Sequence, residues 1–423
     1  MTHPPGQPGS STRADGDVDP AAPPGSRMAA STRSTLLGAM FLMATSAIGP
    51  GFITQTTAFT VELGAAFAFA IAVSILVDIA LQLNVWRIIG VSGRRAQELG
   101  NLVLPGLGWA MAALLLLGGL VFNVGNVSGA GLGTDAMLGL DPRIGGALSA
   151  LIAIGIFLSK RAGLAMDRVV VVLGLVMISL TTFVAVSSGP PVGDALRNTV
   201  LPESVSFLAI TTLIGGTIGG YIVYAGAHRL LDSGVSGPER VRDITRGSVT
   251  GILITGVMRV ILFLAILGVV SAGADLDPDS QAASAFQQAA GEVGLRVFGV
   301  VLWAASITSV IGASYTTVSF VTSRTRTSEK TRTALVCGFI AFTTLVFVVV
   351  GTAPTTLLVF AGAFNGLLLP FGIGVLLWVA TRRADLLRGY AYPRWLLVIG
   401  WTAWLLTLYL AVRSVRPVIE LFA

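Results

Sequence analysis

Long apolar stretches separated by short polar connections fill the sequence after residue 33. About 20 apolar residues cross the hydrocarbon of a bilayer as a helix, whereas a membrane β-barrel shows shorter, alternating segments. The pattern therefore predicts an all-α polytopic membrane protein with about eleven transmembrane helices. We expect these helices at 35–60, 65–88, 106–127, 144–158, 169–187, 206–231, 247–271, 294–321, 333–350, 355–380 and 395–413.

Two of these stretches contain residues that work against a continuous helix. Gly49-Pro50-Gly51 interrupts the first stretch, and the glycine-rich run 215–220 weakens the sixth. Within a bilayer, unwound backbone is tolerated only where protein or a water-filled cavity satisfies its polar groups. Because the interruptions occupy corresponding places in two halves, they predict broken helices 1 and 6 around the substrate site of a secondary transporter.

The number of stretches in each half predicts how the halves are related. Five is odd, so a second half that repeats the first enters the membrane from the opposite side, as in the LeuT-like 5+5 inverted repeat. We expect repeat one at about 35–187, repeat two at about 206–380 and an extra helix at about 395–413, all within a transporter domain spanning 34–423. Residues 1–33 are rich in Pro, Gly and Ser, which predicts a disordered cytoplasmic tail.

Composition and charge narrow the class of protein. The chain is 54% hydrophobic and 11% charged, well below the ~25% charged residues of soluble domains. Its net charge of +6 comes mainly from loop Lys and Arg residues, whose distribution predicts a cytoplasmic N-terminus and an outer C-terminus in a bacterial inner membrane. We expect a bilayer, not nucleic acid, as its surroundings. With one cysteine, two histidines and no catalytic or phosphate-binding motif, we expect neither enzymatic activity nor a cofactor.

The candidate substrate site consists of the two interruptions and nearby polar residues. Free carbonyls at a half-helix end attract cations, and free N–H groups attract anions. No Asp or Glu lies within a few residues of either interruption, so the metal ligands, if any, stay unassigned. The substrate-binding candidates are Gly49, Pro50, Gly51, Phe52, Gly216, Thr217, Gly219, Gly220 and Tyr221, joined by Asn123 and Asn126 of the third stretch.

Three ionisable residues are candidates for ion coupling. Asp78 and Arg259 lie inside the second and seventh stretches, where charged side chains are costly and often functional. Pairing of the two with each other is an equally good interpretation. His228 lies near the cytoplasmic end of the sixth stretch and could titrate near neutral pH, although a solvated helix-end histidine is favoured there. Gly129, Gly131 and Gly133 are interpreted as helix-packing residues.

Several short motifs resemble the NRAMP family of proton-coupled divalent-metal transporters over most of residues 35–380. Ile48–Phe52 is similar to that family's Ile-Asp-Pro-Gly-Asn, and Ile214–Ile218 to its Ile-Gly-Ala-Thr-Val. Three further motifs occur in the same order along the chain as in the family: Leu81-Gln82, Asp167-Arg168 and Leu369–Phe371. The resemblance implies a LeuT-like fold and divalent-cation transport.

The family's functional residues are replaced at the matching positions. The resemblance puts Gly49 and Phe52 where the family has a metal-binding Asp and Asn, Gly219 and Tyr221 where it has Met and His, Gly362 at its span-10 Gln, and Asn123 and Asn126 at acidic residues used for protons. Hydroxyls and carbonyls alone poorly offset the charge of a dehydrated divalent ion. The alternatives are therefore a symporter for a small organic acid or amino-acid-like solute, with a proton or sodium as coupling ion, and a non-transporting membrane sensor or scaffold.

Overall fold

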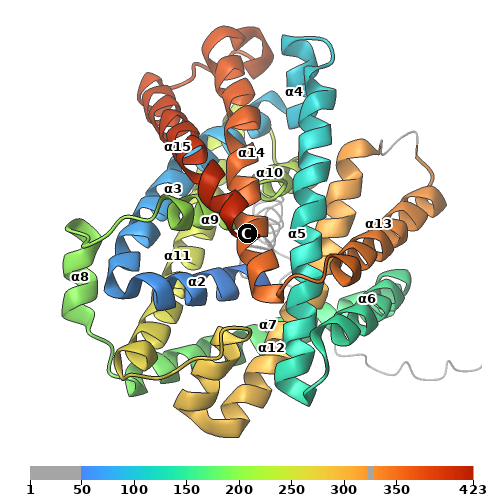
Figure 1. Cartoon of the computed structure of the whole chain (residues 1–423). Helices are drawn as coiled ribbons and strands as arrows, with labels where there is room; N and C mark the ends of the chain where they lie inside the picture. Colours follow the sequence, from blue (N-terminus) through green and yellow to red (C-terminus); the bar gives the residue numbers. More distant parts are fainter. Residues whose placement is uncertain (1–48, 323–326, 423) are drawn as a thin grey trace, which may run out of the picture.

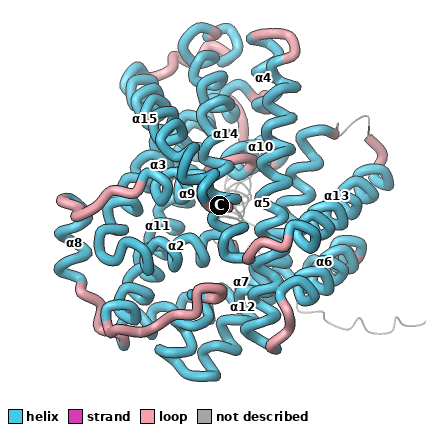
Figure 2. The backbone as a smooth tube through the Cα atoms, in the orientation of Figure 1, coloured by secondary structure: helices cyan, strands magenta, loops and turns pink. Residues whose placement is uncertain are grey.

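The computed structural model describes residues 49–322 and 327–422, apart from the side chains of 160–171 (Figure 1). Within these residues every regular element is a helix, and no strand occurs (Figure 2). The expected tail at 1–33 and the start of the first stretch lie outside the described residues. The prediction of an all-helical membrane protein is confirmed.

The first half of the chain supplies the helices up to the long loop before residue 207. Helix α2 leads through a short 3₁₀ turn into α3, so the chain bends between the first and second predicted stretches without a long connection. The elements are α2 (Pro50–Leu63), η1 (Gly64–Ala66), α3 (Phe67–Ser92), α4 (Ala96–Val103), α5 (Leu107–Leu138), α6 (Pro142–Leu158), α7 (Lys160–Ser187) and α8 (Val192–Val200).

The second half supplies the remaining helices. They are α9 (Phe207–Thr217), α10 (Ile222–Asp232), η2 (Pro238–Arg240), α11 (Val241–Ser271), α12 (Gln281–Val321), α13 (Glu329–Val350), α14 (Pro354–Arg382), η3 (Ala384–Leu387) and α15 (Arg394–Glu420). Each predicted stretch that lies within the described residues coincides with one helix, or with α9 and α10 for the sixth, although α5 and α7 extend well beyond their expected ends. Helix α12 is broken at Gly291, where φ is +66°, so its second part begins close to the expected residue 294. Hydropathy alone therefore located these helices.

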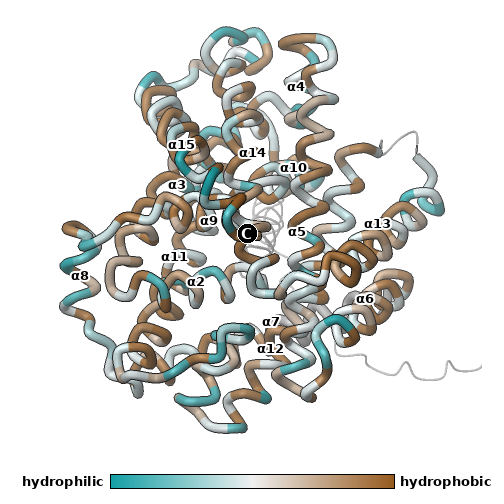
Figure 3. The backbone as a smooth tube through the Cα atoms, viewed as in Figure 1, coloured by the Kyte–Doolittle hydropathy of each residue, from teal (hydrophilic) through white to brown (hydrophobic). Residues whose placement is uncertain are grey.

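Eight helical segments of the described residues are long and apolar enough to cross a membrane, where α2–α3 and α9–α10 each count as one segment. The number is nine if α7 and α8 count as one span bent by 102°. Helix α6 is also apolar, but with 17 residues it is one residue too short to be counted with these segments. Large apolar side chains are exposed on outer helices such as α13, where Phe342, Leu345 and Val349 face outward, and the apolar positions cover the helices in Figure 3. Such a surface suits lipid and not water. The total of eleven spans and the inverted repeat stay predictions.

Glycines allow close approach between the helices around the centre of the bundle. A Cβ on Gly131 would meet the carbonyl of Pro142 at the start of α6, and a Cβ on Gly133 would lie 2.6 Å from the backbone nitrogen of Trp303 on α12. These contacts support the packing interpretation of both glycines. Gly129 also packs closely, but its neighbour is Pro50, the first residue of α2.

Candidate functional site

Helix α2 begins at the first predicted interruption. Gly49 precedes it in an extended conformation, with φ −97° and ψ −172°, and Pro50 occupies the first helical position. Proline is favoured there because its fixed φ suits a helix and its missing N–H would have no partner within that turn. The structure thus places a helix N-terminus at 49–50. The preceding half of the expected broken helix lies outside the described residues.

The second predicted interruption separates α9 from α10. Helix α9 ends at Thr217 and α10 begins at Ile222, with four residues between them. Gly220 there has φ +54°, a left-handed conformation that glycine adopts without the strain of a Cβ. The interruption lies at the end of the glycine-rich run, since Gly215 and Gly216 remain helical.

Gln55, on α2, fills the junction between α2, α9 and α14. Its Nε2 donates a hydrogen bond of 2.8 Å to the carbonyl of Leu358. A Cβ on Gly216 would collide with its Oε1, and a Cβ on Gly362 would lie 2.5 Å from its Nε2. The side chain is fully buried, yet Oε1 has no hydrogen-bond partner among the described residues. An unpaired buried acceptor at this position suits a ligand that donates a hydrogen bond.

The space beside two candidate glycines is therefore occupied. Gln55 takes the volume at Gly216, and a Cβ on Gly219 would meet the backbone of Gly215 in the preceding turn. Sequence reasoning placed Gln55 among the polar side chains near the first interruption but did not count it among the substrate-binding candidates. It lies in a run of four polar residues, 54–57, so the sequence alone did not distinguish it from the threonines beside it.

Asp78 and Arg259 come together at the end of α9. Nη1 of Arg259, on α11, donates a 2.9 Å hydrogen bond to the hydroxyl of Thr217. Its guanidinium carbon lies 4.5 Å from the ring centre of Phe52 on α2, a cation–π arrangement. Asp78, on α3, interacts with the hydroxyl of Thr217 and with the charge of Arg259. The structure thus brings both ionisable candidates to residues of the two interruptions.

This Asp78–Arg259 cluster is buried but incompletely paired. Both side chains are 1% exposed. Oδ1 of Asp78 and both Nε and Nη2 of Arg259 have no hydrogen-bond partner within the described residues, and no direct ion pair joins the two side chains. Unpaired polar atoms of this kind cost free energy of folding, so they are expected where a ligand or a moving charge compensates for them.

Replacing Thr217 by valine is expected to destabilise the protein by about 1–3 kcal/mol, because Nη1 of Arg259 would lose its acceptor inside the bundle. Thr212 is the matched control, since it is also fully buried on α9 but its hydroxyl has no partner. Melting temperatures of the detergent-purified variants measure the difference. Equal losses for T217V and T212V would contradict the role given to Thr217.

The remaining substrate candidates are divided between the junction and other parts of the bundle. Tyr221 is 4% exposed and its ring packs edge-on against Phe122 of α5. Asn123 contacts α12 and α13, because its Nδ2 donates to the hydroxyls of Ser314 and Thr343. Asn126 lies one turn before Gly129, and its Nδ2 has no partner among the described residues.

His228 is not the solvated helix-end residue that the sequence favoured. It is 5% exposed, and its Nε2 accepts a hydrogen bond from the backbone N–H of Ala96. The ring also packs against Phe320. The solvated interpretation failed because α4 and α12 fold over this end of α10. As an acceptor that caps α4, His228 serves a structural contact distinct from the Asp78–Arg259 cluster.

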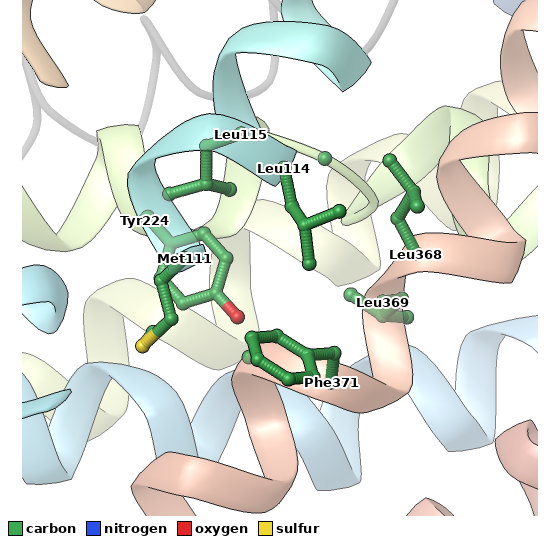
Figure 4. A pocket seen from close by; sticks show the side chains of 9 residues that line it. Met111, Leu114, Leu115, Tyr224, Leu368, Leu369 and Phe371 are labelled. Atoms are coloured by element: carbon green, nitrogen blue, oxygen red, sulfur yellow. The ribbon is translucent and has the colours of Figure 1, made fainter. Parts of the chain in front are cut away.

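A small, partly open cavity lies beside the second interruption, between α5, α10 and α14. Figure 4 shows Tyr224 pointing its hydroxyl between Met111 and Phe371. That buried hydroxyl has no partner in the described structure. The walls are otherwise apolar, so this cavity lacks the charged groups that would select an ion.

Comparison with known proteins identifies the family. The family model described as "Natural resistance-associated macrophage protein-like", or Nramp, matches residues 40–416. The chain belongs to the NRAMP family. The match includes both interruptions, the Asp78–Arg259 cluster and Gln55, so the site described above lies on the NRAMP scaffold.

Two curated relatives of this NRAMP protein are themselves uncharacterised. One is the membrane protein YcsG of Bacillus subtilis (strain 168), which is 54% identical over 367 residues, covering 87% of this chain and 90% of the relative. The other is a membrane protein of Haemophilus influenzae, 49% identical over 388 residues, covering 92% of this chain and 96% of the relative. The chain is thus an integral membrane protein with close relatives of similar length.

Solved structures show that the NRAMP chain has a LeuT-like fold. A manganese transporter of Eremococcus coleocola superposes with a TM-score of 0.72 at 18% identity, covering 95% of this chain and 90% of that one. MhsT in complex with L-phenylalanine superposes with a TM-score of 0.65 at 15% identity, covering 91% and 98%. At these identities the likeness shows the fold, which is the one that the sequence pattern predicted.

The donor atoms of the junction differ from those of a transition-metal site. No group of three or more His, Cys, Asp and Glu side chains that could hold a metal ion occurs in the described residues. The junction offers backbone groups, hydroxyls, the amide of Gln55 and a carboxylate that already faces Arg259. Softer transition metals favour nitrogen and sulfur donors, which are not present among these groups.

Proposed function

We propose that this NRAMP-family protein is a secondary transporter whose solute binds where α2, α9 and α14 meet. Helix α2 starts five residues before Gln55, and α9 ends one residue after Gly216, so one terminus of each helix lies near this junction. Paired interruptions of this kind hold the substrate in transporters with the LeuT-like fold. We further propose a bacterial inner membrane with the N-terminus on the cytoplasmic side.

The cargo that the junction supports best is a small organic acid or amino-acid-like solute. The observation that carries this proposal is the buried guanidinium of Arg259 beside Phe52 and Thr217. The carboxylate of Asp78 offsets the charge of this group, but the two unpaired guanidinium nitrogens can donate hydrogen bonds to a carboxylate and cannot ligate a metal cation. The proposal agrees with the loss of metal-binding side chains that the family resemblance implies at Gly49, Phe52 and Gly219.

A divalent cation is the second candidate, and membership in the NRAMP family favours it. The manganese transporter of Eremococcus coleocola shares the fold. Mg²⁺ releases its water reluctantly and binds through few protein ligands, so a hydrated ion places the smallest demand on the donors present. In this case the helix-end carbonyls and Oε1 of Gln55 would face the ion.

Thermal-shift measurements on purified protein separate the two candidates. A ligand at about 100 times its dissociation constant adds about 2.7 kcal/mol to the folded state. We expect small carboxylates to raise the melting temperature and Mn²⁺ to leave it unchanged. Stabilisation by micromolar Mn²⁺ would favour the cation. Uptake by proteoliposomes distinguishes either transporter from a sensor or scaffold, which would bind without transport.

A further inference from the structure

We propose that Arg259 binds the carboxylate of the transported solute and that Gln55 accepts a hydrogen bond from an N–H or O–H group of the same molecule. The cargo is then a small carboxylate with a hydrogen-bond donor close to the acid, such as a hydroxy, amino or acylamino acid. This inference rests on the proposed transporter function and names the substrate class of its site.

The unpaired edge of the Arg259 guanidinium supports its role in binding a carboxylate. Nη1 is engaged by Thr217, whereas Nε and Nη2 have no partner among the described residues. These two nitrogens form one side of the planar guanidinium, and their parallel N–H groups match the two oxygens of a carboxylate. Thr217 therefore holds Arg259 in an orientation that keeps its carboxylate-binding edge available.

The position of Gln55 supports its role as the acceptor of a hydrogen bond from the solute. Gln55 meets α9 at Gly216, and Arg259 meets α9 at the next residue, Thr217. The unpaired donors of one side chain and the unpaired Oε1 of the other thus lie at consecutive residues of α9. Phe52 precedes Gln55 by three positions on α2, and therefore shares its face. The ring of Phe52 lies over the face of the guanidinium, so it does not cover the in-plane edge formed by Nε and Nη2.

Charge balance at the cluster predicts the coupling ion. Arg259 from α11 is the charged group that acts on Asp78 in the described structure, and α9 contributes the neutral Thr217. The residue of α2 beside the guanidinium is Phe52, which is also uncharged. One buried cation and one buried anion balance each other, so a solute carboxylate adds an uncompensated negative charge. A proton that enters with the solute, held by Asp78, restores the balance.

Calorimetric titration of the full-length protein tests the proposal with lactate, N-acetylglycine and L-alanine, and with N-acetylglycinamide, which has no carboxylate. We expect N-acetylglycine to bind at least about tenfold more tightly than its amide. R259K keeps the positive charge but loses the two parallel N–H groups of the guanidinium, and should weaken carboxylate binding about tenfold or more. R87K is the matched control: Arg87 is also buried between α3 and α11 and bonded to a threonine, Thr245. Its variant should bind as the wild type does.

Titrations in buffers of different ionisation enthalpy count the protons, and we expect about one per bound carboxylate. The proposal is overturned if no member of the panel binds, if R259K binds as tightly as the wild type, or if the amide binds as tightly as the acid. Binding without proton uptake would overturn the role of Asp78. If the R259K variant takes up solute as fast as the wild type, the proposed site is wrong but the proposed transport function stands. If binding depends on Arg259 but no uptake occurs, the transport function is wrong and the proposed site stands.

Discussion

Asparagine in place of Asp78 is expected to lower the free energy of unfolding by about 3–5 kcal/mol, because it leaves the charge of Arg259 buried without its counter-charge. Both side chains are 1% exposed, so water cannot take over the lost interaction. Chemical or thermal denaturation of detergent-purified D78N measures the loss. The expected effect is large because the two charges lie within the bundle and not at its surface.

The double variant D78N/R259Q is the control for this prediction. It removes both charges and keeps the approximate size of both side chains, so we expect it to recover most of the stability that D78N loses. The recovered protein should bind no carboxylate. If D78N is as stable as the wild type, or if the double variant is less stable than D78N, the two residues do not form the coupled pair described here.

Alanine at Gly215 is expected to prevent correct folding, at a cost of about 3 kcal/mol or more, because the added Cβ has no room. It would collide with the carbonyl of Gly362 and lie 2.8 Å from the Cα of Gly366, both on α14. Backbone atoms of a packed helix cannot move without separating α9 from α14. The yield of monodisperse protein and its melting temperature measure this effect.

The neighbouring glycine provides the comparison. A Cβ on Gly216 would meet the end of the Gln55 side chain and not backbone, so G216A is accommodated by rotating that amide. We expect G216A to fold with a much smaller loss of stability and to bind solute less tightly. Equal destabilisation by G215A and G216A would show that the junction does not distinguish backbone from side-chain contacts in this way.

Hydropathy and helix breakers predicted most of the scaffold because both act locally. Apolar runs located α3, α5 and α9–α15, and the run of glycines located the gap between α9 and α10. Helix α8, which follows the bend, was not predicted: Gly189-Pro190-Pro191 marks the end of α7, but the nine residues of α8 are too few and too polar to appear as an apolar stretch. Local patterns also could not reveal that α4 covers His228.

The composition of the site could be predicted only in part because its contacts are long-range. Asp78 and Arg259 were recognised as unusual from their position in apolar stretches, but only the folded chain brings them to Thr217. Gln55 was noted near the first interruption but not separated from the neighbouring threonines, because its position depends on the absence of side chains at Gly216 and Gly362. Asn123 was included in the site, although the fold pairs it with Ser314 and Thr343.

The internal pH of proteoliposomes under an inward gradient of N-acetylglycine tests most directly whether Arg259 serves a carboxylate transporter. The account predicts that wild-type protein acidifies the interior faster than protein-free liposomes do, that R259K largely abolishes this difference, and that R87K does not. A gradient of Mn²⁺ should produce no protein-dependent change. Entry of Mn²⁺ with protons, combined with an N-acetylglycine response no faster than that of protein-free liposomes, would contradict the account and identify the protein as a metal transporter.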